Sequence, residues 1–252
     1  DFLSNNGIND IFTVTGGGAM HLNDALGHHP NLHCTYNHHE QACAIAAEAY
    51  TRYSGKLAVV CVTSGPGGTN AITGVVGGWL DSIPMFVISG QVKRETTTWS
   101  TDVPLRQLGD QEFNITKTVE NMTKYAKMIT EPNEIAYHLE KALYLAEQGR
   151  GGPVWLDIPL DVQGANIETD ELKHFDKSEC LGELPPKVNK DLINKIIEKI
   201  KTSKRPVILA GTGIRLGKAY SQFLEVIDRL NIPVVTAWNA HDVLPNNHRL
   251  FC

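Results

Sequence analysis

The chain has 252 residues, of which 42% are hydrophobic and 20% are charged, and its net charge is −5. This composition is that of a globular protein, and the negative charge argues against nucleic acid as its main partner. No apolar run approaches the roughly 18 to 20 residues that a membrane span needs, and no segment resembles an export signal. The five cysteines form no CxxC pair, which indicates reduced, mostly buried thiols in a cytoplasmic protein.

Apolar runs alternate with helical patterns along the first 160 or so residues, which predicts a parallel α/β domain. Strands are expected at 10–14, 32–37, 56–63, 85–90 and 153–159. Helices are expected at 20–27 with Gly27 as the stop, from Glu40 onward, at 69–80 and at 132–148. The continuous apolar run at 56–63 is typical of a strand that is buried on both faces.

A polar, acidic segment with a Pro-Pro pair spans residues 166–188 and predicts a linker between a first domain, 1–165, and a second unit, 189–252. The second unit begins with a helical pattern whose apolar positions share one face: Leu192, Ile193, Ile196, Ile197 and Ile200. The strand "PVILAG", a helix near 217–230 and the strand "IPVVTAW" follow, which is the opening of another βαβ domain. Because the chain starts without methionine and stops within this domain, we expect it to be a fragment.

Four loops follow expected strands: "VTGGGA", "NHHEQA", "TSGPGGTN" and "SGQVKRE". Ligands of open parallel sheets bind at the carboxyl ends of the strands, so the four loops together predict a ligand site. "SGPGGTN" lacks the lysine and the spacing of a nucleotide P-loop, and Pro66 would instead make it a rigid wall for a flat ring. Ser64 does not stand at the centre of a GxSxG motif, which disfavours a serine hydrolase.

A dense group of histidines raises the alternative of a metal site: His28, His29, His33, His38 and His39. Their spacing fits no HExxH or related pattern. Surface or helix-capping roles are therefore the expectation for them, and no metal ligand is assigned in this chain.

Glu40 stands in the first turn of a helix whose next residues, "ACAIAA", are small and apolar. The helix dipole would stabilise an acid there by about 0.3 to 1 kcal/mol. Because such a helix is expected to pack deeply, the carboxylate would be buried and would need a partner. A ligand that offers a ring nitrogen would satisfy it.

Five ordered blocks resemble the thiamine diphosphate-dependent enzymes of the acetolactate synthase type: "NHHEQACAIAAEAY", "VVCVTSGPGGTNAITGV", "LDSIPMFVISGQV", "LRQLGDQEFNI" and "GPVWLDIPLDVQ". The resemblance implies a pyrimidine-binding domain, built as a parallel sheet with helices on both faces, and then the start of a Rossmann-like central domain of the FAD or nucleotide type. It places the Mg²⁺ and diphosphate motif in a third domain outside this chain. Active sites of the family form between subunits of a homodimer or homotetramer, so the fragment alone would be inactive.

The resemblance implies decarboxylation of a 2-oxo acid, pyruvate above all, and transfer of its two-carbon unit to a second 2-oxo acid. Glu40 would hydrogen-bond N1′ of the aminopyrimidine and favour the imino tautomer, which takes the proton from thiazolium C2. Gln111 matches a catalytic glutamine of the substrate pocket, and Lys124 matches a lysine of the substrate channel. Residues matching the pyrimidine site are Gly16, Gly17, Pro66, Asn70 and Gln91. Residues matching contacts to FAD, in those members that hold it, are Arg150, Gly211, Gly213, Thr236 and Trp238.

Two departures from the biosynthetic pattern border the acceptor side of the site. Thr15 replaces a proline before the glycine pair, and Asp110 replaces a phenylalanine before "QE". The alternative is therefore a related carboligase that transfers the unit to a keto-sugar or another acceptor. An alternative of a different class is a non-catalytic module that binds a flavin or a nucleotide.

Overall fold

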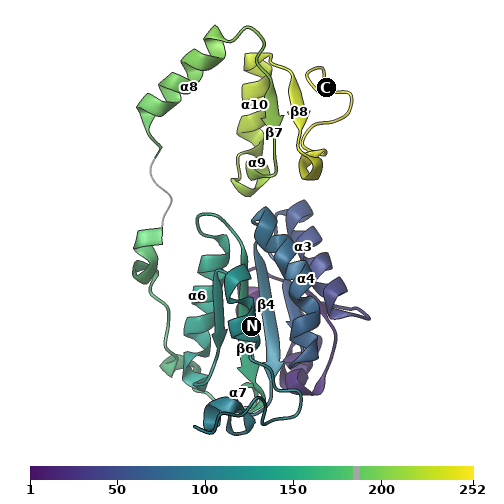
Figure 1. The fold of residues 1–252 in the computed structure, drawn as a ribbon, viewed down its shortest axis with the longest axis vertical. Coiled ribbons are helices and arrows are strands. Elements are labelled where there is room, and N and C mark those ends of the chain that lie inside the picture. The colour runs from purple at the N-terminus through teal and green to yellow at the C-terminus, as the bar shows by residue number, and fades with distance from the viewer. Residues whose placement is uncertain (184–187) are drawn as a thin grey trace. The chain divides into compact units, whose positions relative to one another are not determined.

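The structure is a computed structural model that describes residues 1–183 and 188–252. It contains two compact units, Asp1–Leu184 and Pro185–Cys252 (Figure 1). Each unit has a parallel sheet and helices of its own, so both are of the α/β class, as predicted.

A six-stranded parallel sheet forms the centre of the first unit, with the strand order β2-β1-β3-β4-β6-β5. Its strands are β1 (Asp10–Thr13), β2 (His33–Tyr36), β3 (Val59–Val62), β4 (Met85–Gln91), β5 (Tyr125–Met128) and β6 (Pro153–Pro159). Every residue of β3, β4 and β6 is buried, which confirms that the run at 56–63 reflects a strand covered on both faces.

Helices cover both faces of this sheet, as predicted. They are α1 (Phe2–Asn5), α2 (Met20–His28), α3 (Glu40–Ser54), α4 (Pro66–Asp81), α5 (Ile115–Val119), α6 (Ile135–Glu147) and α7 (Leu160–Gln163). Figure 1 shows α6 on one side of β4 and β6, and α3 with α4 on the other. The domain therefore has three layers.

Successive residues of a strand pack into two different hydrophobic cores, because side chains alternate between the two faces of a sheet. On β3, Val59 and Cys61 pack with α2 and α6, while Val60 and Val62 pack with α3, α4 and α5. Trp155 of β6 is fully buried in the second of these cores. The helices that begin at Glu40 and Pro66 are thus held on one face of the sheet.

Two sequence predictions for the first unit needed correction, and one strand was missed. Gly27 lies inside α2, which ends one residue later at His28, so it is not the stop. Helix α4 begins at Pro66, earlier than expected, because proline is well suited to the first turn of a helix. Strand β5 was not predicted, since its four residues, "YAKM", form a partly exposed edge strand without an apolar run.

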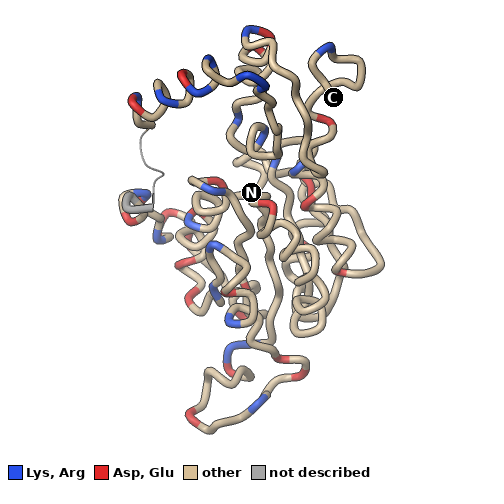
Figure 2. The backbone as a smooth tube through the Cα atoms, turned by 45° about the horizontal axis from the view of Figure 1, so that its top comes forward, with Lys and Arg blue, Asp and Glu red and all other residues tan. Residues whose placement is uncertain are grey.

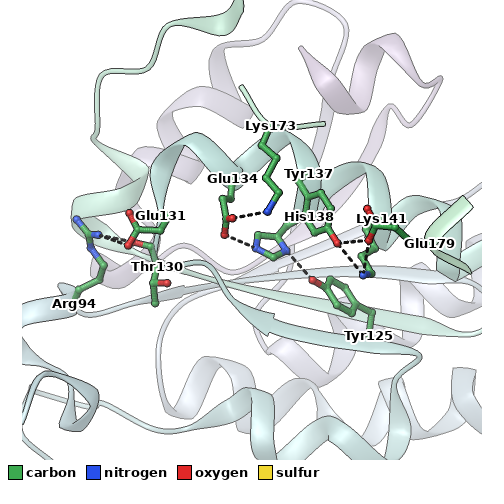
Figure 3. A network of polar contacts seen from close by, with 10 residues as sticks. All are labelled: Arg94, Tyr125, Thr130, Glu131, Glu134, Tyr137, His138, Lys141, Lys173 and Glu179. Carbon is green, nitrogen blue, oxygen red and sulfur yellow. Dashed lines mark hydrogen bonds and ion pairs between the residues drawn. The ribbon is translucent and has the colours of Figure 1, made fainter. Parts of the chain in front are cut away.

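Much of the segment predicted as a linker packs on the first unit. Lys173 Nζ lies 2.8 Å from Glu134 Oε1, and His174 Nδ1 lies 2.7 Å from Glu140 Oε1. Phe175 packs against the core that includes α6, and Cys180 is a buried member of that core. Figure 3 shows Glu134 and Lys173 within a wider set of polar contacts that surrounds Tyr137 and His138. The first unit therefore extends past the predicted end at residue 165, while residues 184–187 of the linker lie outside the described residues.

The second unit contains a two-stranded parallel sheet, as expected for the opening of a βαβ domain. Its elements are α8 (Lys190–Thr202), β7 (Ile208–Ala210), α9 (Gly213–Leu216), α10 (Tyr220–Leu230) and β8 (Val234–Thr236). Buried Ile227 of α10 packs with Ala210 and Val234 of the two strands. Helix α8 includes the predicted helical pattern and carries acidic and basic residues along its length (Figure 2). It leaves Leu192, Ile193, Ile196 and Ile197 exposed.

All five cysteines are free thiols, and Cys43, Cys61 and Cys180 are buried, as predicted. Burial raises the pKa of the Cys61 thiol to about 12. Within residues 1–183 and 188–252, no helix combines the length and the apolar character that crossing a bilayer requires.

Candidate cofactor and active site

The four loops singled out in the sequence follow β1, β2, β3 and β4, which are neighbours in the sheet. Because these strands are parallel, their carboxyl ends and the four loops meet at one edge. The structure thus brings Gly16, Glu40, Pro66 and Gln91 to the same edge, as the sequence predicted.

Glu40 is the first residue of α3, where the partial positive charge of the helix end favours a carboxylate. Its Oε2 accepts a hydrogen bond from Asn70 Nδ2 at 2.9 Å. Its Oε1 has no hydrogen-bond partner among the described residues and faces Gly67, where an added Cβ would lie 3.7 Å away. Glu40 is half-buried, so it is less buried than the sequence predicted. The partner that the buried carboxylate was expected to need is, for one of its oxygens, Asn70.

His39 caps α3, because its Nδ1 accepts a hydrogen bond from the Gln41 amide at 3.1 Å. This confirms the capping role expected for one of the histidines. His29 lies 3.2 Å from an oxygen of Asp1, and His28 contacts Asp24. Among the residues that the structure describes, no three His, Cys, Asp or Glu side chains form a group that could hold a metal ion.

The turn between β3 and α4 depends on glycine at position 65. Gly65 has φ +54°, and a Cβ there would lie 2.2 Å from the carbonyl oxygen of Gln111. Gln111 itself has φ +58° and is exposed. The predicted substrate-pocket glutamine therefore lies in a loop that packs directly on the Pro66 turn.

The glycine loop after β1 is held close to the ends of β3 and β4. The Gly18 amide donates a hydrogen bond to Thr63 Oγ1 at 3.1 Å, and its carbonyl accepts one from Gln163 Nε2 at 2.7 Å. A Cβ at Gly90 would lie 2.0 Å from the same carbonyl oxygen, so β4 can approach the loop only through a glycine. Nothing lies within 4 Å of a Cβ at Gly17, which leaves open space beside this part of the loop.

Gln91 was expected to line the rim of the pyrimidine site, but its side chain is directed into the protein. Only 2% of it is exposed, and its amide bonds to Asp157, to the Phe113 carbonyl and to the Val92 amide. Burial raises the pKa of Asp157 to about 7, although hydrogen bonds from Ser89 and Gln91 oppose the shift. Asp157 and Ser89 were not among the residues predicted from the sequence, where the signal for them was a polar residue inside each apolar strand.

Lys124 and Arg150 lie at the opposite edge of the sheet from Glu40, because Lys124 comes just before the start of β5 and Arg150 comes just before the start of β6. Lys124 Nζ donates to the carbonyl of Gln148, and Arg150 Nε donates to Ser82 Oγ at 2.6 Å. Within this unit the structure therefore does not bring Lys124 or Arg150 to Glu40, and their roles stay predictions.

Four residues expected at a flavin site gather at the carboxyl edge of the second unit's sheet: Gly211, Gly213, Thr236 and Trp238. Ala210 and Thr236 are partners in the β7–β8 register, so Gly211 and Trp238 follow the two strands at one end. No atom lies within 4 Å of a Cβ at Gly211 or Gly213, and 98% of Trp238 is exposed. The edge has room for a flat ring beside an aromatic side chain.

Two family models match the chain. One, described as the thiamine pyrophosphate enzyme N-terminal TPP binding domain, matches residues 1–118. The other, described as the thiamine pyrophosphate enzyme central domain, matches residues 193–252. The two matches fall on the two structural units, one on each.

Curated relatives resemble the chain along almost its whole length. The acetolactate synthase large subunit of Lactococcus lactis is 35% identical over 254 residues, which cover 97% of this chain and 41% of that protein. A probable acetolactate synthase large subunit of Methanococcus aeolicus is also 35% identical and covers 95% of this chain and 39% of its own length. Acetolactate synthase 1, chloroplastic, of Zea mays is 32% identical over 91% of this chain and 34% of its own length. The chain thus spans about two fifths or less of these relatives.

Proposed function

We propose, because the chain belongs to the thiamine pyrophosphate enzymes, that it supplies the pyrimidine-binding side of an enzyme of the acetolactate synthase type. This enzyme decarboxylates a 2-oxo acid, pyruvate above all, and transfers the two-carbon unit to a second 2-oxo acid. The observation that carries the proposal is Glu40, whose carboxylate stands at a helix N-terminus with one oxygen bound to Asn70 and the other without a partner among the described residues.

The residues around Glu40 fit the pyrimidine ring of thiamine diphosphate. The open space at Gly17 leaves room for a flat ring at the edge of the sheet where Glu40 and the Pro66 turn also lie. When bound, thiamine diphosphate supplies the carbon nucleophile and the electron sink that decarboxylation of a 2-oxo acid requires.

Glu40 would exchange a proton with a ring nitrogen through Oε1, while the Asn70 amide holds Oε2 and so fixes the plane of the carboxylate. Acid–base assistance of this kind contributes about 10²- to 10⁴-fold to a rate. Gln111, in the loop on the Pro66 turn, would contact the substrate from the side of Gly65. Asp110 adds an exposed acid beside it.

The remaining assignments are also proposals. Mg²⁺ and the diphosphate would be bound by residues outside this chain, and the enzyme would be a cytoplasmic homodimer or homotetramer. FAD would bind the second unit at Gly211, Gly213, Thr236 and Trp238, a reading supported by the open glycines and the exposed indole. Arg150 and Lys124 would act in the assembled enzyme, at the flavin and in the substrate channel.

The test is product analysis on the full-length protein with pyruvate, thiamine diphosphate and Mg²⁺, with and without a second 2-oxo acid or a keto-sugar. Acetolactate from pyruvate alone is the expected result. Carbon dioxide released only with a keto-sugar would favour the alternative carboligase. No decarboxylation under any condition, together with binding of FAD alone, would overturn the proposal in favour of a non-catalytic flavin module.

A further inference from the structure

Three polar residues lie fully inside the apolar strands at the centre of the first unit. Ser89 and Gln91 of β4 are 1% and 2% exposed, and Asp157 of β6 is 1% exposed. The register sets Ser89 directly opposite Asp157. Burying a carboxyl group costs free energy unless hydrogen bonds satisfy it, so the contacts of this group are informative.

The three side chains form one continuous hydrogen-bonded chain. Trp155 Nε1 donates to Ser89 Oγ at 2.8 Å, and Ser89 Oγ donates to Asp157 Oδ1 at 2.6 Å. Asp157 Oδ2 accepts from Gln91 Nε2 at 3.0 Å. Both oxygens of the buried acid therefore have a partner, and the acid fixes which way the Gln91 amide points.

The Gln91 side chain, oriented in this way, also bonds to a loop at the carboxyl edge of the sheet. Its Nε2 also donates to the Phe113 carbonyl at 3.0 Å, and its Oε1 accepts from the Val92 amide at 3.0 Å. All polar atoms of the side chain are thus bound to protein groups. Gln91 is built to hold the backbone at Phe113 and has no polar atom left for a ligand.

The loop that ends at Phe113 carries Gln111 and has two further anchors. Glu112 accepts hydrogen bonds from the amides of Thr98, Leu108 and Gly109. Burial alone would raise the pKa of Glu112, but these bonds outweigh it and the pKa is lowered. The carbonyl of Gln111 lies close against Gly65. The bond from Gln91 to the Phe113 carbonyl ties the loop to the interior of the sheet.

We propose that Asp157 and Gln91 are positioning residues, which hold the Gln111 loop against the Pro66 turn and so set the substrate side of the site that faces Glu40. The role of that site in substrate binding rests on the proposed function. The placement of the loop by Gln91 and Asp157 is independent of the proposed function. Asp157 acts only through Gln91, and neither residue would touch the substrate or the cofactor.

The first test is hydrogen–deuterium exchange on the full-length protein without cofactor. Gln91→Met keeps the size of the side chain but removes the bonds to Phe113, Val92 and Asp157. We expect amides in residues 109–113 to exchange up to about tenfold faster relative to amides in α4. A change of this size corresponds to the loss of one or two hydrogen bonds. Tyr125→Phe removes the bond to His138 on β5 and α6, and serves as the matched control for a general loss of stability. Equal effects of the two variants on residues 109–113, or none from Gln91→Met, would overturn the proposal.

A second pair of variants tests Asp157 and replaces the first if Gln91→Met fails to fold. Asp157→Asn leaves an oxygen that can accept from Gln91, whereas Asp157→Leu removes every acceptor. Protection of residues 109–113 should survive in the asparagine variant and be lost in the leucine variant. Equal protection in both would show that the acid does not position the loop.

Kinetics on the same variants separate the proposal from the proposed function. Gln91→Met should raise KM for pyruvate by about tenfold, with little change in the thiamine diphosphate concentration needed for half-saturation. If the wild-type protein shows no decarboxylation while the exchange result holds, the proposed function fails and the positioning role stands. If the wild type is active but Gln91→Met changes neither KM nor exchange, the positioning role fails alone.

Discussion

Asn70 Nδ2 lies 2.9 Å from Glu40 Oε2, and this bond joins the first turn of α3 to the second turn of α4. It fixes the carboxylate plane and leaves Oε1 toward Gly67. The position of the proposed proton-transfer group thus depends on how the two helices pack, and not on Glu40 alone.

Glu40→Gln is expected to reduce turnover of the full-length enzyme by at least about 10²-fold, because the amide keeps the bond to Asn70 but cannot exchange a proton. The measurement is steady-state pyruvate decarboxylation at saturating thiamine diphosphate. Glu48→Gln, two turns further along α3, weakens the pair with Arg52 and should lower the melting temperature while leaving turnover close to wild type. Near-normal turnover in Glu40→Gln would refute the assignment of Glu40.

Two glycines of α4 should respond in opposite ways to alanine. A Cβ at Gly74 would lie 2.5 Å from Ala44 Cβ, whereas a Cβ at Gly77 would meet no atom within 4 Å. Gly74→Ala must push α3 and α4 apart and should destabilise the protein by about 1 to 3 kcal/mol. Gly77→Ala should stabilise it by up to about 1 kcal/mol, through helix propensity alone. Denaturant unfolding gives both values, and a stabilising Gly74→Ala would show that the helices are not in close contact.

The sequence predicted the elements that have strong local signals. Apolar runs marked β3, β4 and β6, and Glu40 was correctly placed at the start of α3. The sequence could not predict β5, because this strand is stabilised by its pairing with β6 and has no apolar run of its own. The bond between Glu40 and Asn70 spans 30 positions, and the one between Gln91 and Asp157 spans 66, so no local pattern indicates either.

The predicted linker provides a further example and a test. The polar composition of the segment gave no sign that Phe175 packs on the core beneath α6. Ile167, in the same segment, is 37% exposed and lies outside that core. Phe175→Ala should therefore destabilise the first unit by about 2 to 4 kcal/mol, and Ile167→Ala should change its stability by no more than about 0.5 kcal/mol. Thermal unfolding of both variants checks the expectation. Equally small effects of the two substitutions would show that Phe175 does not stabilise the first unit, and that the segment is a linker as predicted.

Asp157 should make stability depend on pH in the opposite sense to most acids. Burial raises its pKa from 3.8 to about 7 in the folded state, so the native protein holds a proton that the unfolded chain releases. The stabilisation is complete below 3.8 and is lost as the pH rises through about 7. Within this window the free energy of unfolding falls by up to about 1.4 kcal/mol per pH unit.

Asp157→Asn removes this titration, and the other ionisable groups cancel in a comparison with the wild type. The difference in free energy of unfolding, wild type minus variant, should therefore decline as the pH rises from 3.8 toward about 7 and level off above it. Urea unfolding at a series of pH values measures this difference. Parallel curves would mean that the Asp157 carboxyl titrates alike in the folded and the unfolded chain, so that its hydrogen bonds from Ser89 and Gln91 offset its burial completely.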